Sequence, residues 1–253
     1  MSSSTGGSAA IESIDSVAYI FNELKGRIGI SSNFWFRGNS SADYDLQPRA
    51  FRPEYINADE VSMLNEFRQK AALVSGIHPT DNWGWMVLAQ HYGLPTRLLD
   101  WSDNPLQGLF FACQSDVDNK GKEKDGKFFI LNPQKMNDDA FGVVDFPFPL
   151  VLEDKEQNCD NYRPEASNGG DKPIAVIAMD YFPRIGAQNG CFTVCSDKTY
   201  KYKDAATIME FTIPGEKKER ILGELEFAGV NVASTYPDLD HLAQQIAKKH
   251  EDR

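Results

Sequence analysis

Residues 89–112 constrain the fold of this chain most strongly, because hydrogen-bonding side chains stand there directly beside side chains that belong in a core. The segment reads AQHYGLPTRLLDWSDNPLQGLFFA. Its polar members include Gln90, His91, Thr96, Arg97, Asp100 and Ser102, and its large apolar members include Leu98, Leu99, Trp101, Leu109, Phe110 and Phe111. Burying a charge or an amide without a partner costs several kcal/mol. The segment therefore indicates either a dense internal network or a binding site at the edge of a core, and we favour the binding site.

A length of 253 residues suffices for one large domain or two small ones. We expect a single domain over residues 11–250, preceded by a flexible tail at 1–10 that reads MSSSTGGSAA. The stretches near 116–126 and 153–172 lack apolar periodicity and are rich in Asp, Asn, Lys and Gly, which predicts mobile surface loops.

Apolar periodicity and capping residues predict a mixture of short helices and strands. The expected helices are 11–25, 59–75, one capped by Thr80 and ending near 91, one capped by Asn104 and ending near 115, 214–229, and one capped by Asp238 with Leu239, Leu242 and Ile246 facing inward. The expected strands are 34–36, 98–101, 127–131, 173–181, 190–195, 208–213 and 230–233. Because regular βαβ alternation is missing, the pattern favours an α+β domain.

Charge and composition argue against several classes of function and of site. The formal net charge of −11 repels phosphate backbones and disfavours nonspecific nucleic-acid binding. We expect no membrane span, since no apolar run approaches the roughly 20 residues required. The four cysteines have no CxxC spacing and only four histidines exist, which disfavours a metal site. Without a secretory signal, the thiols are expected to be reduced and the chain cytoplasmic.

The tripeptide Phe36-Arg37-Gly38 ends the first expected strand. An arginine there presents a rigid fork of donors to an adjacent groove. Gly38 removes a side chain that would block the close approach of a ligand. The alternative for Arg37 is a structural ion pair with one of the many carboxylates.

Arg97 and Asp100 lie three positions apart at one expected strand, so their side chains project to opposite faces and each needs another partner. Ser102 follows, just before a helix N-terminus whose N–H groups favour anions. His91 is either a general base, a ligand-orienting group or a structural residue at a helix end.

Residues 184–192, RIGAQNGCF, follow an apolar strand, and their two glycines flank an amide pair. This is either a plain hairpin turn or a loop that brings the Gln188 amide into the same groove as Arg37. The sequence contains no GxxxxGK[ST], GxGxxG, HExxH or GxSxG, which argues against P-loop NTPases, standard Rossmann dehydrogenases, zincins and α/β-hydrolases.

These segments, FWFRG at 34–38, AQHYGLPTRLLDW at 89–101, NPLQGLFFA at 104–112 and RIGAQNGCF at 184–192, resemble the FRG domain family, named after its Phe-Arg-Gly motif. The resemblance runs from about residue 31 to 245, where a closing segment at 236–240 is also similar. The family occurs widely in bacteria and phages, and its function is largely unassigned.

More distantly, the chain resembles ADP-ribosyltransferases of the Arg-Ser-Glu type, which implies a split β-sheet core with flanking helices. Arg37-Gly38 looks like the first element of that family, and Ser102 before Leu109-Phe110-Phe111-Ala112 looks like the second. The third element departs from the pattern. The best-placed candidate is Gln188, with Glu210 on strand 208–213 as a substitute.

The resemblance implies that NAD is the substrate. Arg37, Gly38, Arg97 and Ser102 are then expected to bind it, Gln188 or Glu210 to contact the ribose hydroxyls, and His91 or Asp100 to act as base or orient the acceptor. It also implies a toxin, effector or defence component of a bacterium or phage, with a protein as possible acceptor or partner.

A glutamine cannot supply the negative charge of a glutamate, so several activities stay open. They are ADP-ribosyl transfer, NAD hydrolysis, and a noncatalytic nucleotide-sensing or protein-interaction module. A nuclease activity is disfavoured by the acidic balance and by the lack of a clustered acidic metal site.

Overall fold

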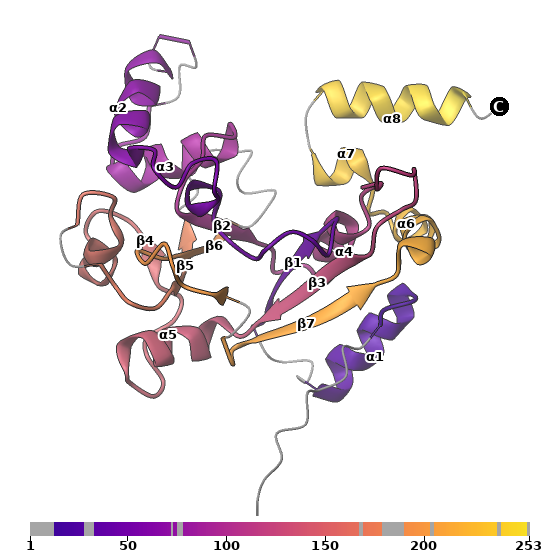
Figure 1. Cartoon of the computed structure of the whole chain (residues 1–253), viewed down its shortest axis with the longest axis horizontal. Helices are drawn as coiled ribbons and strands as arrows, with labels where there is room; N and C mark the ends of the chain where they lie inside the picture. Colours follow the sequence, from indigo (N-terminus) through magenta and orange to yellow (C-terminus); the bar gives the residue numbers. More distant parts are fainter. Residues whose placement is uncertain are drawn as a thin grey trace, which may run out of the picture.

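The computed structural model describes residues 13–27, 33–71, 73–74, 78–166, 169–178, 190–202, 205–236 and 239–251, and all structural statements below concern these residues. Helices and two β-sheets make up the chain, as expected for an α+β protein. Figure 1 shows the two sheets side by side, with helices around them.

The first sheet has the strand order β1-β3-β7 and is antiparallel throughout. Its strands are β1 (Trp35–Asn39), β3 (Gly126–Leu131) and β7 (Ile208–Ile213). One face carries Phe36, Phe128 and Phe211 in one apolar cluster. That cluster also contains residues of α1 (Val17–Arg27), α4 (Pro105–Ala112) and α6 (Lys218–Phe227), so these helices cover the face (Figure 1).

The second sheet has the order β2-β6-β5-β4. Its strands are β2 (Leu98–Trp101), β6 (Cys191–Val194), β5 (Ile174–Ala178) and β4 (Val151–Leu152), of which β4 alone pairs in parallel. Helices α2 (Glu60–Ala71) and α3 (Asn82–His91) pack on one face through Leu64, Trp83 and Met86. Helix α5 (Pro133–Phe141), which the sequence did not predict, packs on the other face through Met136.

The two sheets meet where β1 runs beside the end of β2. Phe36 N donates to Ser102 O at 2.7 Å, and Ser102 N donates to Phe36 O at 2.8 Å. Beside this bridge, Trp35 and Leu131 of the first sheet share a cluster with Leu99 and Trp101 of the second. The bridge places the Phe-Arg-Gly strand directly against the strand that carries Asp100.

Several element boundaries differ from the sequence prediction. Asp81, and not Thr80, caps α3, because its Oδ1 accepts from Gly84 N at 2.7 Å. The first helix begins at Val17 because Ser13 pairs with Thr212 of β7. The expected cap Asp238, the end of strand 173–181 and the tail 1–10 lie outside the described residues.

Two predictions near the C-terminus are wrong. The strand expected at 230–233 is instead the short helix α7 (Val232–Thr235), which a capping box at Asn231 starts. In α8 (Leu239–Glu251), Leu239, Leu242 and Ile246 are exposed by 81%, 44% and 53% and do not face inward.

The segment 153–172 is only partly a surface loop. Residues Gln157–Tyr162 form the 3-10 helix η2, and Cys159 and Tyr162 are buried in the cluster under α3. The other predicted loop contains an isolated bridge between Val117 and Glu123. Short 3-10 turns also precede α2, at Arg49–Phe51 (η1), and α6, at Gly215–Lys217 (η4).

Candidate functional site

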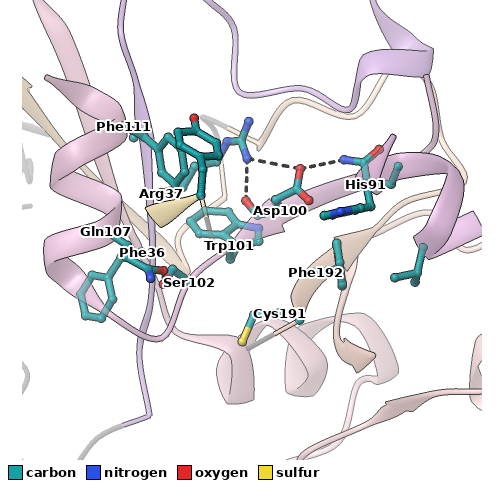
Figure 2. A pocket seen from close by; sticks show the side chains of 15 residues that line it. Phe36, Arg37, His91, Asp100, Trp101, Ser102, Gln107, Phe111, Cys191 and Phe192 are labelled. Atoms are coloured by element: carbon teal, nitrogen blue, oxygen red, sulfur yellow. Dashed lines mark hydrogen bonds and ion pairs between the residues drawn. The ribbon is translucent and has the colours of Figure 1, made fainter. Parts of the chain in front are cut away.

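A pocket of about 310 Å³ opens at the junction of the two sheets. We call it the aromatic pocket, since its apolar walls come from Phe36, Trp101, Phe111, Phe192 and Tyr236. Its polar lining comes from Arg37, Gln90, His91, Asp100, Ser102 and Gln107. Most of the lining residues come from β1, β2 and β6 of the two sheets and from α3 and α4, and Figure 2 labels most of them.

Arg37 points from the middle of β1 toward β2 (Figure 2). Its Nη1 donates to Asp100 O at 2.6 Å and lies 4.0 Å from Asp100 Oδ2. Burial lowers the pKa of Arg37, and the nearby charge of Asp100 partly opposes this. The buried Nε–H meets no acceptor among the described residues. Since buried donors are nearly always satisfied in folded proteins, this unsatisfied donor marks the pocket wall at Arg37 as a position that lacks an acceptor.

The Asp100 carboxylate is held by a chain of hydrogen bonds. Thr96 Oγ1 donates to Gln90 Oε1 at 2.6 Å, and Gln90 Nε2 donates to Asp100 Oδ2 at 2.7 Å. The side chain of Asp100 is still 55% exposed. Among the described residues it is the one carboxylate that lines the aromatic pocket, so it is the available source of negative charge there.

Ser102 orients its neighbours at the start of α4. Its Oγ accepts from Asn104 N at 3.0 Å and donates to Gln107 Oε1 at 2.9 Å. Asn104 in turn caps Leu106 N, as the sequence predicted. These side chains already satisfy the Asn104 and Leu106 N–H groups, so Ser102 contributes mainly by aiming the Gln107 amide.

The walls are fixed by ring contacts and by one buried hydrogen bond. Trp101 Nε1 donates to Thr193 Oγ1 at 3.1 Å. Tyr236 meets Phe111 edge-on, with ring centroids 6.0 Å apart, and burial raises the pKa of the Tyr236 hydroxyl. His91, at the end of α3, lies edge-on to Tyr92 at 5.2 Å.

Two of the predicted site residues lie elsewhere. Arg97 is buried, does not line this pocket, and bonds through Nε and Nη2 to Glu60 Oε2 at 2.9 and 2.8 Å. Its Nη1 donates to two backbone carbonyls, so we assign it a structural role. Glu210 lies on β7, away from β1 across β3, and pairs with Lys127 at 2.5 Å. The prediction that Arg97 and Asp100 find separate partners is confirmed.

Gly38 lines the pocket, but the reason for the glycine differs from the one expected. A Cβ at this position would lie 2.1 Å from Gly108 O and 2.2 Å from Ala112 N. The absence of a side chain at Gly38 therefore allows the backbone of α4 to pack directly against β1. Gln188 lies outside the described residues, while the neighbouring Gly190 and Cys191 line the pocket.

Gln107 and Tyr236 line the pocket although neither was predicted from the sequence as a site residue. Gln107 carries the one hydrogen-bonding side chain of α4, an otherwise apolar helix, and that contrast is a usable signal. Tyr236 reaches the pocket from the far end of the chain, so nothing in its local sequence could have placed it there.

Within the described ranges, no cluster of three or more His, Cys, Asp or Glu could hold a metal ion. None of the described helices is long and apolar enough to cross a membrane. All four cysteines are free and buried, and burial raises the pKa of Cys191, which lines the pocket, to about 12.

Comparison with known proteins finds a family match over the part of the chain that contains most of the pocket residues. Residues 32–121 match the FRG domain family, which confirms the resemblance seen in the Phe-Arg-Gly strand and in the segment 89–112. The matched range contains Arg37, His91, Asp100, Ser102 and Gln107, and it ends before the similar segments at 184–192 and 236–240. No curated protein and no solved structure matches the chain.

Proposed function

We propose that the FRG domain carried by this chain binds NAD in the aromatic pocket and cleaves its nicotinamide–ribose bond, as an ADP-ribosyltransferase-like enzyme or an NAD glycohydrolase. One observation supports this most. Five residues chosen for the site from the sequence, Arg37, Gly38, His91, Asp100 and Ser102, line a single pocket although they come from separate segments.

The size and lining of the pocket suit one half of a dinucleotide such as NAD. Its volume of about 310 Å³ lies at the lower end of the range for small-molecule sites, roughly 300–1,000 Å³. Aromatic side chains offer their faces and edges to a planar ring. The guanidinium of Arg37, whose side chain is 19% exposed, suits a phosphate or ribose oxygen at the pocket edge.

Asp100 supplies the charge that the reaction needs. When the C1′–N bond breaks, its electron pair leaves with nicotinamide and positive charge develops on the ribose. A fixed carboxylate stabilises such charge in the transition state. A nucleophile, water or an acceptor side chain, then bonds to C1′, and His91 takes up its proton. Because Glu210 is paired with Lys127 outside the pocket, Asp100 takes the role that the family resemblance gave to a glutamate.

One observation favours a second candidate function, a noncatalytic nucleotide sensor. The hydrogen-bond chain from Thr96 through Gln90 already engages the Asp100 carboxylate, and Arg37 lies beside it. Such a network shapes a pocket without requiring chemistry. In that case a protein partner would bind the nucleotide-bound form of the domain, and the acidic surface suits such a partner.

Release of nicotinamide from NAD by the pure protein tests the proposal. We expect turnover by the wild type and a loss of about 100-fold or more in kcat for Asp100→Asn, with NAD still bound in calorimetry. Arg37→Ala is expected to weaken NAD binding itself. Glu210→Gln is the matched control and is expected to keep wild-type activity.

The other outcomes decide between the candidates. NAD binding without turnover in the wild type favours the sensor. Loss of activity in Glu210→Gln but not in Asp100→Asn would refute the assignment of the carboxylate. No binding of NAD at millimolar concentration would remove both NAD-based functions.

A further inference from the structure

A second pocket, of about 200 Å³, adjoins the aromatic pocket. Arg37, Gln90 and Asp100 line both, so these three residues form the partition between them. The second lining adds Arg49 and Arg52, and we call it the arginine pocket.

The arginine pocket concentrates positive charge in an acidic protein. Among the described residues, three arginines line it against one carboxylate, that of Asp100, while the whole chain has a formal net charge of −11. Three guanidinium groups at one small pocket repel one another unless an anion lies between them.

Each arginine keeps donors available. Arg49 Nη1 donates to Gly93 O at 2.8 Å, and the guanidinium lies 5.6 Å from the centre of the Tyr55 ring, which holds the group in place. Among the described residues, the Arg52 guanidinium has no hydrogen bond or ion pair, and its charge helps to lower the pKa of Arg37, after the larger effect of burial. The Nε–H of Arg37 is buried and unsatisfied.

We propose that the arginine pocket is a phosphate subsite, in which Arg37, Arg49 and Arg52 bind phosphoryl groups. The guanidinium fork matches phosphate oxygens in bidentate geometry, and the partition places these oxygens next to the aromatic pocket. The phosphoryl groups belong either to the dinucleotide, which then spans both pockets, or to a second, phosphorylated substrate. The dinucleotide alternative rests on the proposed function, whereas the subsite itself does not.

Calorimetry with pyrophosphate, ADP-ribose and nicotinamide tests the subsite in wild type and Arg52→Gln. We expect the Kd of pyrophosphate and of ADP-ribose to rise by about 10- to 100-fold in the variant, because one charge-assisted hydrogen bond is lost. Nicotinamide, which has no phosphate, is expected to bind both proteins equally. The matched control is Arg220→Gln, since Arg220 lies 62% exposed on α6 and pairs with Glu224.

A second variant, Arg49→Gln, is expected to weaken the same two ligands, and thermal unfolding checks that each variant is folded. Competition then identifies the source of the phosphate. Pyrophosphate that competes with NAD assigns the subsite to the dinucleotide, and simultaneous binding assigns it to a second substrate.

The subsite is refuted if the wild type does not bind pyrophosphate, or if folded Arg52→Gln and Arg49→Gln bind it as tightly as the wild type. If NAD is neither bound nor cleaved while pyrophosphate binding still depends on Arg52, the proposed function fails and the subsite stands. If NAD is cleaved normally while the Kd of pyrophosphate is unchanged in both Arg49→Gln and Arg52→Gln, only the subsite proposal is refuted.

Discussion

Arg97 and Glu60 form a buried ion pair that joins α2 to the start of β2. The exposed fractions of the two side chains are 8% and 7%, and Glu60 Oε1 also accepts from Arg97 N at 3.0 Å. The guanidinium also donates to the backbone carbonyls of Tyr162, the last residue of η2, and of Arg163, which follows it. Every charge here has a partner, which is the condition under which a buried ion pair is tolerated.

We predict that Arg97→Ala or Glu60→Ala lowers the free energy of unfolding by about 3–5 kcal/mol, because each leaves the other charge buried and unpaired. Urea unfolding measures the difference. Arg220→Ala, at an exposed pair on α6, is expected to change stability by about 1 kcal/mol at most. A small loss in both buried variants would contradict the structural role of Arg97.

At the scale of elements, the packing of α4 against β1 decides the shape of the site. Gly38 and Gly126 lie under the backbone of the helix, and a Cβ on Gly126 would be 2.3 Å from Ala112 O. With both glycines the helix lies close enough for Ser102 and Gln107 to meet beside Arg37. A larger side chain at either position pushes the helix away.

We predict that Gly38→Ala lowers the free energy of unfolding by about 3 kcal/mol or more, since the new methyl group meets backbone atoms that cannot rotate away. Gly223→Ala is the matched control. It lies inside α6 with nothing within 4 Å of the added Cβ, and is expected to stabilise the chain by about 0.5–1 kcal/mol. Chemical denaturation of both variants checks the contrast, and similar stabilities would argue against the tight contact of α4.

At the scale of the whole molecule, every apolar cluster contains a buried thiol. Cys113, Cys159, Cys191 and Cys195 are distributed over the three clusters. Burial raises the pKa of each from the ordinary 9.0 to about 12. The folded chain therefore holds these protons over a range of pH in which the unfolded chain releases them.

From this we predict that the stability contributed by these protonated thiols is fully present below about pH 9 and is lost as the pH rises toward 12, because the unfolded state binds fewer protons in that window. Thermal unfolding between about pH 8 and pH 11 measures the fall in Tm. Cys113→Ala removes one titrating group and is expected to reduce the slope of stability against pH. A Tm that stays constant across this range would contradict the prediction.

The sequence by itself determined the local features of the chain. Asn104 and Pro105 predicted the start of α4, and the apolar runs predicted β2, β3 and β7. The Phe-Arg-Gly strand with the segment 89–112 predicted the match of residues 32–121 to the FRG domain family. Alternation along a strand also separated Arg97 from Asp100, as observed. Caps, periodicity and motifs depend on residues within a few positions of one another, so one sequence is enough to detect them.

Only the tertiary structure decided which groups share a pocket. It paired Glu210 with Lys127, made Asp100 the one carboxylate among the described residues that lines the aromatic pocket, and brought Tyr236 to a pocket formed mainly by residues 36–111. It also left the apolar residues of α8 exposed, although their spacing indicated a buried face. These outcomes depend on contacts between segments far apart in the chain, and no local pattern records them.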